Sequence, residues 1–295
     1  MLNTAILGAG AMGCLYASYL CKNPNINLTL LDHRAEKVDE INKNGLLMVE
    51  NDQEIPFSVP AKVSGRGRQE PVDILLIFVK AHQTYAALKA NRSLIGPKTV
   101  VVSLQNGMGN CETVQGILPD NQIIPATTAA GAYRQENTVV HAGDGEIFYG
   151  GSNDLSWLST DRLPWIRTAD IERMMLMKLA ANSVINPLTA LLKKTNGVLN
   201  SHKEQVKELT EEIYNVIGRI DCSITPDELD RYIWDIISRT AQNRSSMLSD
   251  LISGNKTEID SIAGYVITQA DELGIPIPKL RDIYNQIKAQ ESKND

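Results

Sequence analysis

The sequence predicts an α/β protein in two parts, a doubly wound parallel sheet followed by an all-α region. Short apolar runs alternate with helical patterns up to about residue 168, and a glycine-rich turn over residues 8–13 follows the first run. Beyond residue 168, strand patterns stop and long helical periodicities begin. We therefore expect one domain over residues 1–168 and a second over residues 169–295.

The first domain opens with an expected strand over Leu2–Leu7, and we expect a helix to begin at Cys14. The run 73–79 is almost continuously apolar, which is typical of a strand buried on both faces of a parallel sheet. Other expected strands cover 28–31, 99–104 and 122–125, and expected helices cover 83–94 and 111–117. The runs 138–141 and 146–150, joined by Ala-Gly-Asp-Gly, predict a β-hairpin.

The second domain is expected to contain long amphipathic helices. Apolar residues recur at helical spacing over Ile171–Leu192, Lys203–Ile220 and Lys256–Leu273. Another helix is expected to begin at Pro226, because Thr225 suits the N-cap and proline suits the first helical position.

Composition narrows the class of protein. A formal net charge of −6 disfavours non-specific nucleic-acid binding. The 4 cysteines stand far apart and the 4 histidines lack ligand spacing, so we expect reduced thiols and no metal site. No run of about 18 apolar residues and no basic region before an apolar core are present. We therefore expect a cytoplasmic protein without a membrane partner.

The glycine turn is the first candidate site. A strand, the sequence Gly-Ala-Gly-Ala-Met-Gly and a helix follow one another, which is the pattern of a Rossmann-like dinucleotide-binding domain. The first glycine permits the tight turn, the second lets the backbone approach a pyrophosphate, and the third lets helix and strand pack closely. The residues expected to bind the cofactor here are Gly8, Ala9, Gly10, Ala11, Met12 and Gly13.

The second candidate site is a polar stripe on an apolar helix. Lys178, Asn182 and Asn186 are spaced at i, i+4 and i+8, which places them on one helix face. Such a stripe needs partners or water. It is either a row of donors facing a ligand, with Lys178 as the proton source, or a solvated face, or a set of caps before a kink at Pro187.

Two loops of the first domain follow expected strands. Val79-Lys80 ends one strand, and Asn106-Gly107-Met108-Gly109 follows the next. Ligands of open α/β sheets bind outside the carboxyl ends of the strands, so we expect both loops near the nicotinamide half of a cofactor. A surface lysine and an ordinary turn are the alternatives.

Together these features resemble the ketopantoate reductase (2-dehydropantoate 2-reductase) family along nearly the whole chain. The resemblance lies in the glycine turn, Val79-Lys80, 106–109, 178–190, Asn196-Gly197, 245–250 and 257–260. It implies a two-domain oxidoreductase that reduces a small 2-keto acid with NAD(P)H. The reaction would convert ketopantoate to pantoate, in the synthesis of pantothenate and coenzyme A.

The resemblance also implies roles for individual residues. Lys178 matches the catalytic lysine, whose ammonium would polarise the ketone and donate a proton. Glu258 matches an acid that would keep this lysine protonated. Positions expected to bind substrate are Asn106, Asn182, Asn186, Asn196, Ser246 and Glu258, and further cofactor contacts are Lys80, Asn106, Ala132 and Glu258.

The end of the second strand departs from the family pattern. The family usually prefers NADPH and often has an arginine there, whereas this chain reads Asp32-His33-Arg34. An acid about 20 residues beyond the glycines is the usual ligand of the ribose 2′-hydroxyl in NAD enzymes. NADP(H) is favoured on family grounds, with Arg34 able to reach a 2′-phosphate, and Asp32 keeps NAD(H) open.

Two other functions are compatible with the sequence. The chain could act on another small 2- or 3-hydroxyacid, or it could be a non-enzymatic NAD(P)H-binding redox sensor. The set Lys178, Asn182, Ser246 and Glu258 favours an enzyme, because a sensor does not need it. The sequence leaves both a monomer and a homodimer open.

Overall fold

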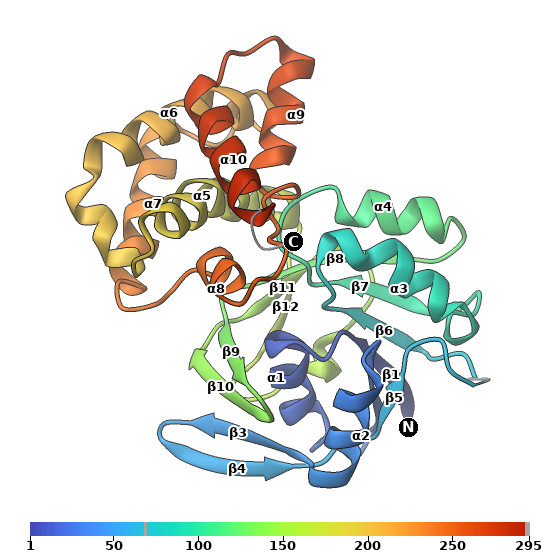
Figure 1. Cartoon of the computed structure of the whole chain (residues 1–295). Helices are drawn as coiled ribbons and strands as arrows, with labels where there is room; N and C mark the ends of the chain where they lie inside the picture. The colour runs from blue at the N-terminus through green and yellow to red at the C-terminus, as the bar shows by residue number, and fades with distance from the viewer. Residues whose placement is uncertain (68–69, 293–295) are drawn as a thin grey trace. The chain divides into compact units, whose positions relative to one another are not determined.

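A computed structural model describes residues 1–67 and 70–292 of the chain (Figure 1). It divides into two compact units. The first unit comprises Met1–Gln105 and Asn110–Ile171, and the second comprises Asn106–Gly109 and Glu172–Asp295. The short segment Asn106–Gly109, which follows a strand of the first unit, therefore packs with the helices of the second.

The main sheet of the first unit has the strand order β12-β11-β8-β7-β6-β1-β2-β5. Its neighbouring strands are parallel except for β11 and β8, which are antiparallel. The expected parallel sheet is thus confirmed. The strands are β1 (Leu2–Leu7), β2 (Ile26–Asp32), β5 (Ala61–Val63), β6 (Ile74–Ile77), β7 (Val100–Ser103), β8 (Ile123–Thr128), β11 (Ile147–Tyr149) and β12 (Trp165–Arg167).

The main sheet is covered on both faces, because its strand residues alternate between two hydrophobic cores. Ile6 belongs to one core and its neighbours Ala5 and Leu7 to the other. The helices α1 (Ala11–Leu20) and α2 (Ala35–Asn44) contribute to the first core, and α3 (Thr84–Ala90) and α4 (Asn110–Ile117) contribute to the second. The helix α1 begins at Ala11 and not at Cys14, since Cys14 N already donates to Gly10 O.

A second sheet, with the order β4-β3-β10-β9, packs against α1. Its strands are β3 (Leu46–Glu50), β4 (Gln53–Phe57), β9 (Gly131–Gln135) and β10 (Thr138–Gly143). The expected hairpin of 138–141 with 146–150 is wrong, because β10 pairs with β9 and β3 whereas β11 pairs with β8 and β12. The glycine-containing segment between β10 and β11 carries the chain from one sheet to the other.

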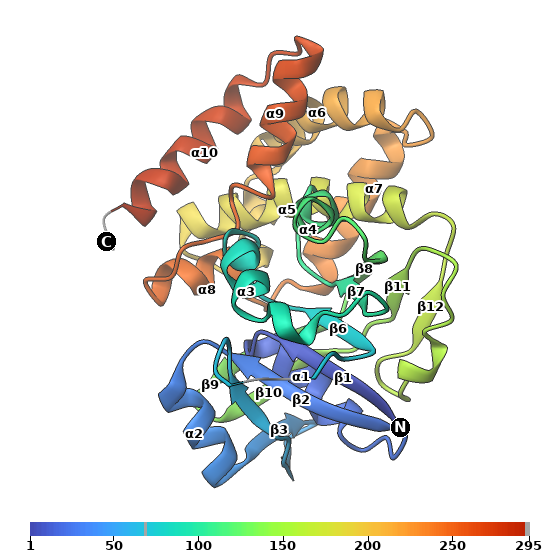
Figure 2. The ribbon, with the colours of Figure 1, turned by 90° about the vertical axis from the view of Figure 1, so that its right-hand side faces the viewer.

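The second unit is helical (Figure 2). Its helices are α5 (Ile171–Leu192), α6 (Lys203–Ile220), α7 (Pro226–Arg239), α8 (Ser246–Ile252), α9 (Ala263–Leu273) and α10 (Pro278–Glu291). The helix α6 packs against α7, α9 and α10. By length and composition α5 could cross a membrane, but 72% of its apolar window is buried inside the protein, as in a core helix.

The expected bounds of α5 and α6 are confirmed, as is the start of α7 at Pro226. The Thr225 hydroxyl accepts a hydrogen bond from Glu228 N at 3.3 Å, as an N-cap should. The expected helix 256–273 is wrong in its first part, since α9 begins only at Ala263. Residues 256–262 form an irregular segment held by side chains of α10.

Short 3₁₀ turns complete the described chain. They cover Ala81–Gln83, Arg92–Leu94, Ser156–Leu158 and Asn196–Ser201. The expected helix over 83–94 is therefore only partly present, as α3 with a 3₁₀ turn on each side.

Candidate active site

The glycine turn lies where the strand order of the main sheet reverses. The strand β1 pairs with β2 on one side and with β6 on the other, and the turn follows the carboxyl end of β1. Gly8 N donates to Leu31 O, and Phe78 N donates to Leu7 O, so the ends of the three strands are joined beside the turn. This switch point is where open α/β sheets bind their ligands.

The three glycines differ in what surrounds them. Gly8 has a φ of 112°, and a Cβ there would lie 2.9 Å from Val79 N. A Cβ on Gly13 would collide with the carbonyl oxygen of Gly8, so this glycine permits close packing of α1 on the turn. A Cβ on Gly10 would meet no described atom within 4 Å. The N-terminus of α1, which no side chain caps, thus opens beside free space that suits a pyrophosphate.

Asp32, at the end of β2, is neutralised by basic neighbours. Its carboxylate accepts hydrogen bonds from Arg34 N and Nε at 3.0 and 3.1 Å and pairs with Lys37 Nζ at 3.3 Å. Burial raises the pKa of Asp32, but the hydrogen bonds from Arg34 and the charge of Lys37 outweigh burial and lower the pKa to about 2. The side chain of Asp32 is only 5% exposed, whereas that of Arg34 is 53% exposed.

Two basic residues at the glycine turn were not found from the sequence. Lys37 of α2 and Arg134 of β9 both donate to the carbonyl oxygen of Ala9, Arg134 at 2.6 Å. Lys37 lies in the first turn of α2, three residues after Arg34, which is the N-cap of this helix, and this spacing is a weak signal in the sequence. Nothing in the sequence indicates Arg134, because only the second sheet brings β9 to α1.

Two further expected cofactor contacts of the first unit, Lys80 and Ala132, are half-buried. Lys80 follows β6 and precedes the 3₁₀ turn, and its carbonyl accepts from Gln83 N at 2.8 Å. Ala132 lies in β9 opposite His141 of β10. Neighbouring strand ends are tied by Gln105, whose Nε2 donates to Val79 O at 2.7 Å.

The polar stripe of α5 lies in the second unit. Lys178 and Asn182 are half-buried, and Asn186 is buried, with 8% of its surface exposed. The adjacent Ser183 hydroxyl has no hydrogen-bond partner among the described residues. Beyond Pro187, the Thr189 hydroxyl lies 2.9 Å from Ser245 Oγ and so ties α5 to the start of α8.

Glu258 connects the stripe to the segment after β7. Burial lowers the pKa of Lys178 to about 8, while the nearby Glu258 carboxylate opposes this shift by raising it. Asn106 Nδ2 donates to Glu258 Oε2 at 3.4 Å. The structure therefore brings three expected site residues together, an acid, an amide and an ammonium whose pKa is near the neutral range.

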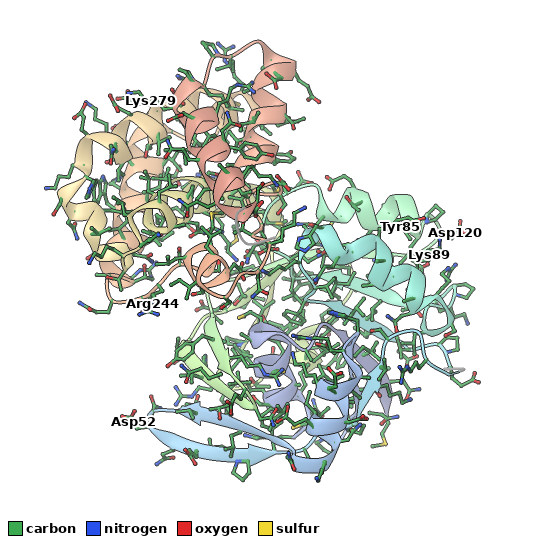
Figure 3. The ribbon with its side chains drawn as sticks, in the orientation of Figure 1. Asp52, Tyr85, Lys89, Asp120, Arg244 and Lys279 are labelled. Carbon is green, nitrogen blue, oxygen red and sulfur yellow. The ribbon has the colours of Figure 1, made fainter. Side chains whose placement is uncertain are left out.

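Asn196 and Ser246 lie in two other elements of the second unit, the 3₁₀ turn Asn196–Ser201 and α8. Asn196 N donates to Asn243 O at 2.9 Å, and its Nδ2 donates to Thr240 Oγ1 at 2.8 Å. Its Oδ1 is buried without a hydrogen-bond partner in the described part of the chain. Ser246 is exposed in the first turn of α8, two residues after Arg244, which is also exposed and is labelled in Figure 3.

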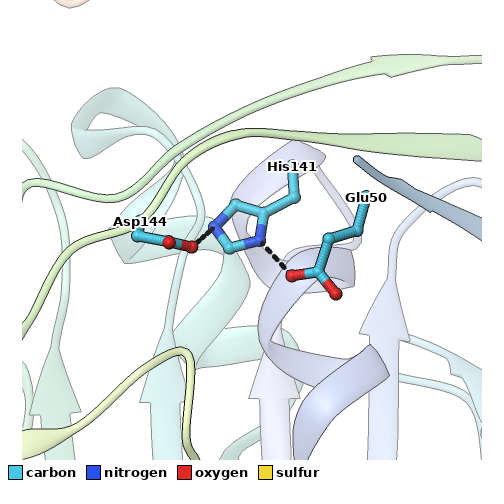
Figure 4. Close-up of side chains that lie close together, drawn as sticks. All are labelled: Glu50, His141 and Asp144. Atoms are coloured by element: carbon cyan, nitrogen blue, oxygen red, sulfur yellow. Dashed lines mark hydrogen bonds and ion pairs between the residues drawn. The ribbon is translucent and has the colours of Figure 1, made fainter. Parts of the chain in front are cut away.

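A further polar cluster lies in the first unit. Figure 4 shows His141 between Glu50 and Asp144, and these side chains are close enough to hold a metal ion. The two carboxylates, however, face opposite ring nitrogens, at 3.3 Å from Nδ1 and 3.5 Å from Nε2. Arg162 also pairs with both acids. This arrangement suits an ion-pair network better than one chelated ion.

The doubly wound sheet with its glycine turn, together with the helical unit that carries Lys178, defines a class of nicotinamide-nucleotide oxidoreductases. Family comparison agrees along the chain. Residues 4–154 match the family model "Ketopantoate reductase PanE/ApbA", and residues 170–291 match its C-terminal counterpart. The chain belongs to the ketopantoate reductase PanE/ApbA family.

Relatives of known name cover almost the whole chain. A 2-dehydropantoate 2-reductase of Shigella flexneri is 30% identical over 302 residues, which are 99% of this chain and 96% of the relative. The enzyme of that name from Bacillus subtilis (strain 168) is 30% identical over 310 residues, with 98% of each chain covered.

Solved structures share the fold. A PanE/ApbA family ketopantoate reductase from Ralstonia eutropha JMP134 superposes with a TM-score of 0.91, at 25% identity and 99% coverage of both chains. A D-mandelate dehydrogenase in complex with NADH and anilino(oxo)acetate gives the same TM-score and coverage at 24% identity. The latter likeness concerns the fold alone.

Proposed function

We propose that this chain is a 2-dehydropantoate 2-reductase that reduces ketopantoate to pantoate with NAD(P)H. The observation that carries the proposal is the Lys178 ammonium near the Glu258 carboxylate: burial lowers the pKa of the lysine and Glu258 opposes this shift, with a pKa of about 8 as the result. At pH 7, about nine-tenths of such a lysine is protonated. Membership of the ketopantoate reductase family and the 30% identical relatives support the choice of substrate.

Residues of the chain have separate roles in the proposed reaction. Bound reduced nicotinamide supplies the hydride for C2 of the ketone. The Lys178 ammonium hydrogen-bonds the ketone oxygen, stabilises the growing negative charge and donates its proton to the alkoxide. Glu258 stabilises the charged form of Lys178. Asn182, Asn186 and Asn196 bind the hydroxyl end of the substrate, and Ser246 binds its carboxylate.

The cofactor is expected to lie on the glycine turn, with its pyrophosphate at the N-terminus of α1. We propose that NADPH is preferred over NADH. Asp32 would repel a 2′-phosphate if its charge were free, but Arg34 and Lys37 both pair with it. Arg34 is half-exposed and His33 is 70% exposed, so both can approach a phosphate.

We also propose that the enzyme acts in the cytoplasm on a small-molecule substrate. Within the described residues, the cysteines Cys14, Cys21, Cys111 and Cys222 are free thiols, which supports a reducing compartment. A homodimer is proposed as well, and sedimentation velocity would distinguish it from a monomer. One solved structure that shares the fold is of a dimeric ketopantoate reductase from Staphylococcus aureus.

The test is oxidation of NADPH and NADH, followed at 340 nm, with ketopantoate and a panel of other 2-keto and 3-keto acids. We expect turnover with ketopantoate, and Lys178→Ala should lower it at least 10²-fold because a general acid is lost. Lys207→Ala, an exposed position of α6, is the control and should leave the rate unchanged. Turnover only with another acid would move the assignment to a different hydroxyacid dehydrogenase, and cofactor binding without any turnover would favour a redox sensor.

A further inference from the structure

The last turn of α10 holds the segment that carries Glu258. Glu291, the final residue of α10, accepts two hydrogen bonds at Oε1 from Thr257, one from the backbone N at 2.7 Å and one from the hydroxyl at 2.6 Å. Glu291 is 9% exposed and Thr257 is 1% exposed. Thr257 directly precedes Glu258, so these bonds fix the backbone from which the Glu258 side chain leaves.

Two more side chains from the same face of α10 hold this segment. Tyr284, Lys288 and Glu291 follow one another at i, i+4 and i+7. The Tyr284 hydroxyl donates to Asp260 at 2.7 Å, and Lys288 Nζ lies 3.1 Å from Asp260 and 2.9 Å from Glu291. One helix face thus holds the residues on both sides of Glu258.

Glu291 is an unexpected residue at its position. A carboxylate is unfavourable at the C-terminal end of a helix, where the helix dipole is negative, and its burial costs further free energy. Burial raises the pKa of Glu291, but the hydrogen bonds from Thr257 and the charge of Lys288 outweigh burial and lower it. Glu291 is therefore ionised near neutral pH and acts as a charged acceptor for Thr257.

The other side of the segment is fixed to Asn106–Gly109. Glu258 O accepts from the backbone N of Ser261 and of Ile262, both at 3.1 Å. Ser261 O in turn accepts from Met108 N at 3.2 Å. Because Asn106 also donates to the Glu258 carboxylate, both the backbone and the side chain of Glu258 are restrained.

We propose that Glu291 is a positioning residue, which holds Thr257 so that the Glu258 carboxylate stays beside Lys178 and keeps that lysine protonated. This inference rests on the proposed role of Lys178 as proton donor. The charged groups where the segment 256–262 contacts α10 are Lys256 and Asp260 of the segment, Lys288 of α10, and Glu258 itself. Glu291 contacts Thr257 and Lys288, and it acts on Glu258 through Thr257.

The test measures the titration of Lys178 in the absence of substrate. The protein is labelled with an amine-reactive reagent between pH 6 and 11, and the labelled fraction of Lys178 is measured by mass spectrometry. The variants are Glu291→Ala, Glu291→Gln and Glu258→Ala. Lys279→Ala is the matched control, because it removes an ion pair with Glu208 at the opposite end of α10 (Lys279 is labelled in Figure 3).

The labelling midpoint of Lys178, the pH at which half of it reacts, should be lower in Glu258→Ala than in the wild type. In Glu291→Ala the midpoint should fall by a large part of that difference. Glu291→Gln should shift it less, since its amide oxygen still accepts from Thr257. Combining Glu291→Ala with Glu258→Ala should add nothing to the shift, because both act through one carboxylate. Lys279→Ala should match the wild type.

An unchanged midpoint in Glu291→Ala, or an equal shift in Lys279→Ala, would overturn the proposal. If Glu291→Ala does not fold, Thr257→Val removes one of the two hydrogen bonds and must shift the midpoint in the same direction. In steady-state assays, kcat of Glu291→Ala should fall about tenfold, as is typical when a side chain that orients a functional residue is removed, with the KM for the cofactor unchanged within twofold. Wild-type protein without ketopantoate turnover would contradict the proposed function alone, since the labelling needs no substrate.

Discussion

Among single residues, Lys178 combines a helix position that the sequence predicts with a pKa that only the fold can set. The spacing of Lys178, Asn182 and Asn186 follows from the helix period and could be found in the sequence. The pKa depends on burial and on Glu258, which is 80 residues away along the chain. Glu291 and Arg134 escaped the sequence analysis for the same reason, because their partners are distant in sequence.

Because of Lys178, the pH–rate profile of keto-acid reduction should have a basic limb, in which kcat falls. The protonated amine is the active form, so activity is full below its pKa and is lost as pH rises through about 8. Measuring kcat between pH 6 and 10 checks this. In Glu258→Gln the limb should move to lower pH, because the carboxylate that raises the pKa of Lys178 is gone. A limb that stays in place in this variant would contradict the pairing.

Arg34 should set the cofactor preference. In Arg34→Ala, we expect kcat/KM for NADPH to fall about 10- to 100-fold, as for the loss of a charged hydrogen bond worth about 1.5–3 kcal/mol. The value for NADH should change little, because NADH has no 2′-phosphate for Arg34 to bind and Lys37 still pairs with Asp32. The ratio of the two kcat/KM values is the readout. Arg167→Ala, in β12 at the edge of the sheet, is the control and should keep the wild-type ratio.

Among helices and strands, sequence patterns predicted the elements whose bounds depend on residues near in sequence. The bounds of α5 and α6 follow from apolar periodicity, and the start of α7 follows from a cap and a proline. The hairpin failed because β10 and β11 each find partners in a different sheet. Residues 256–262 have a helical pattern, but Thr257 bonds to Glu291 and the helix starts only afterwards.

The cap of α7 should contribute to stability without affecting catalysis. Thr225→Ala removes the hydroxyl that accepts from Glu228 N, and should lower the free energy of unfolding by about 1 kcal/mol. Thr225→Ser should restore most of this loss, since serine caps equally well. Urea denaturation gives the stabilities. A kcat for Thr225→Ala that differs from the wild type under native conditions would show that α7 has a further role.

On the scale of the whole molecule, the two units hold different parts of the proposed chemistry. The glycine turn, Asp32 and Arg34 belong to the first unit, and Lys178 and Glu258 belong to the second. The first unit has two hydrophobic cores, and the second unit has a core of its own. Binding of the adenosine half of the cofactor and proton donation should therefore be separable by mutation.

Thermal unfolding with and without NADPH tests this separation. A cofactor at about 100 times its Kd should stabilise the folded protein by about 2.7 kcal/mol. Gly10→Ala should fold normally, because its Cβ meets no described atom within 4 Å and its φ of −72° suits alanine. It should nevertheless lose most of the NADPH-induced rise in Tm, since the Cβ enters the space expected to hold the pyrophosphate.

Two controls complete this experiment. Gly116→Ala makes the same chemical change in α4, where the added Cβ again meets nothing within 4 Å, and should keep the full Tm rise. Lys178→Ala should also keep most of the rise while losing turnover, because the lysine lies in the helical unit. If Gly10→Ala kept the full rise, the cofactor would not lie on the glycine turn. Loss of the rise in Lys178→Ala would instead mean that the helical unit contributes much of the cofactor affinity.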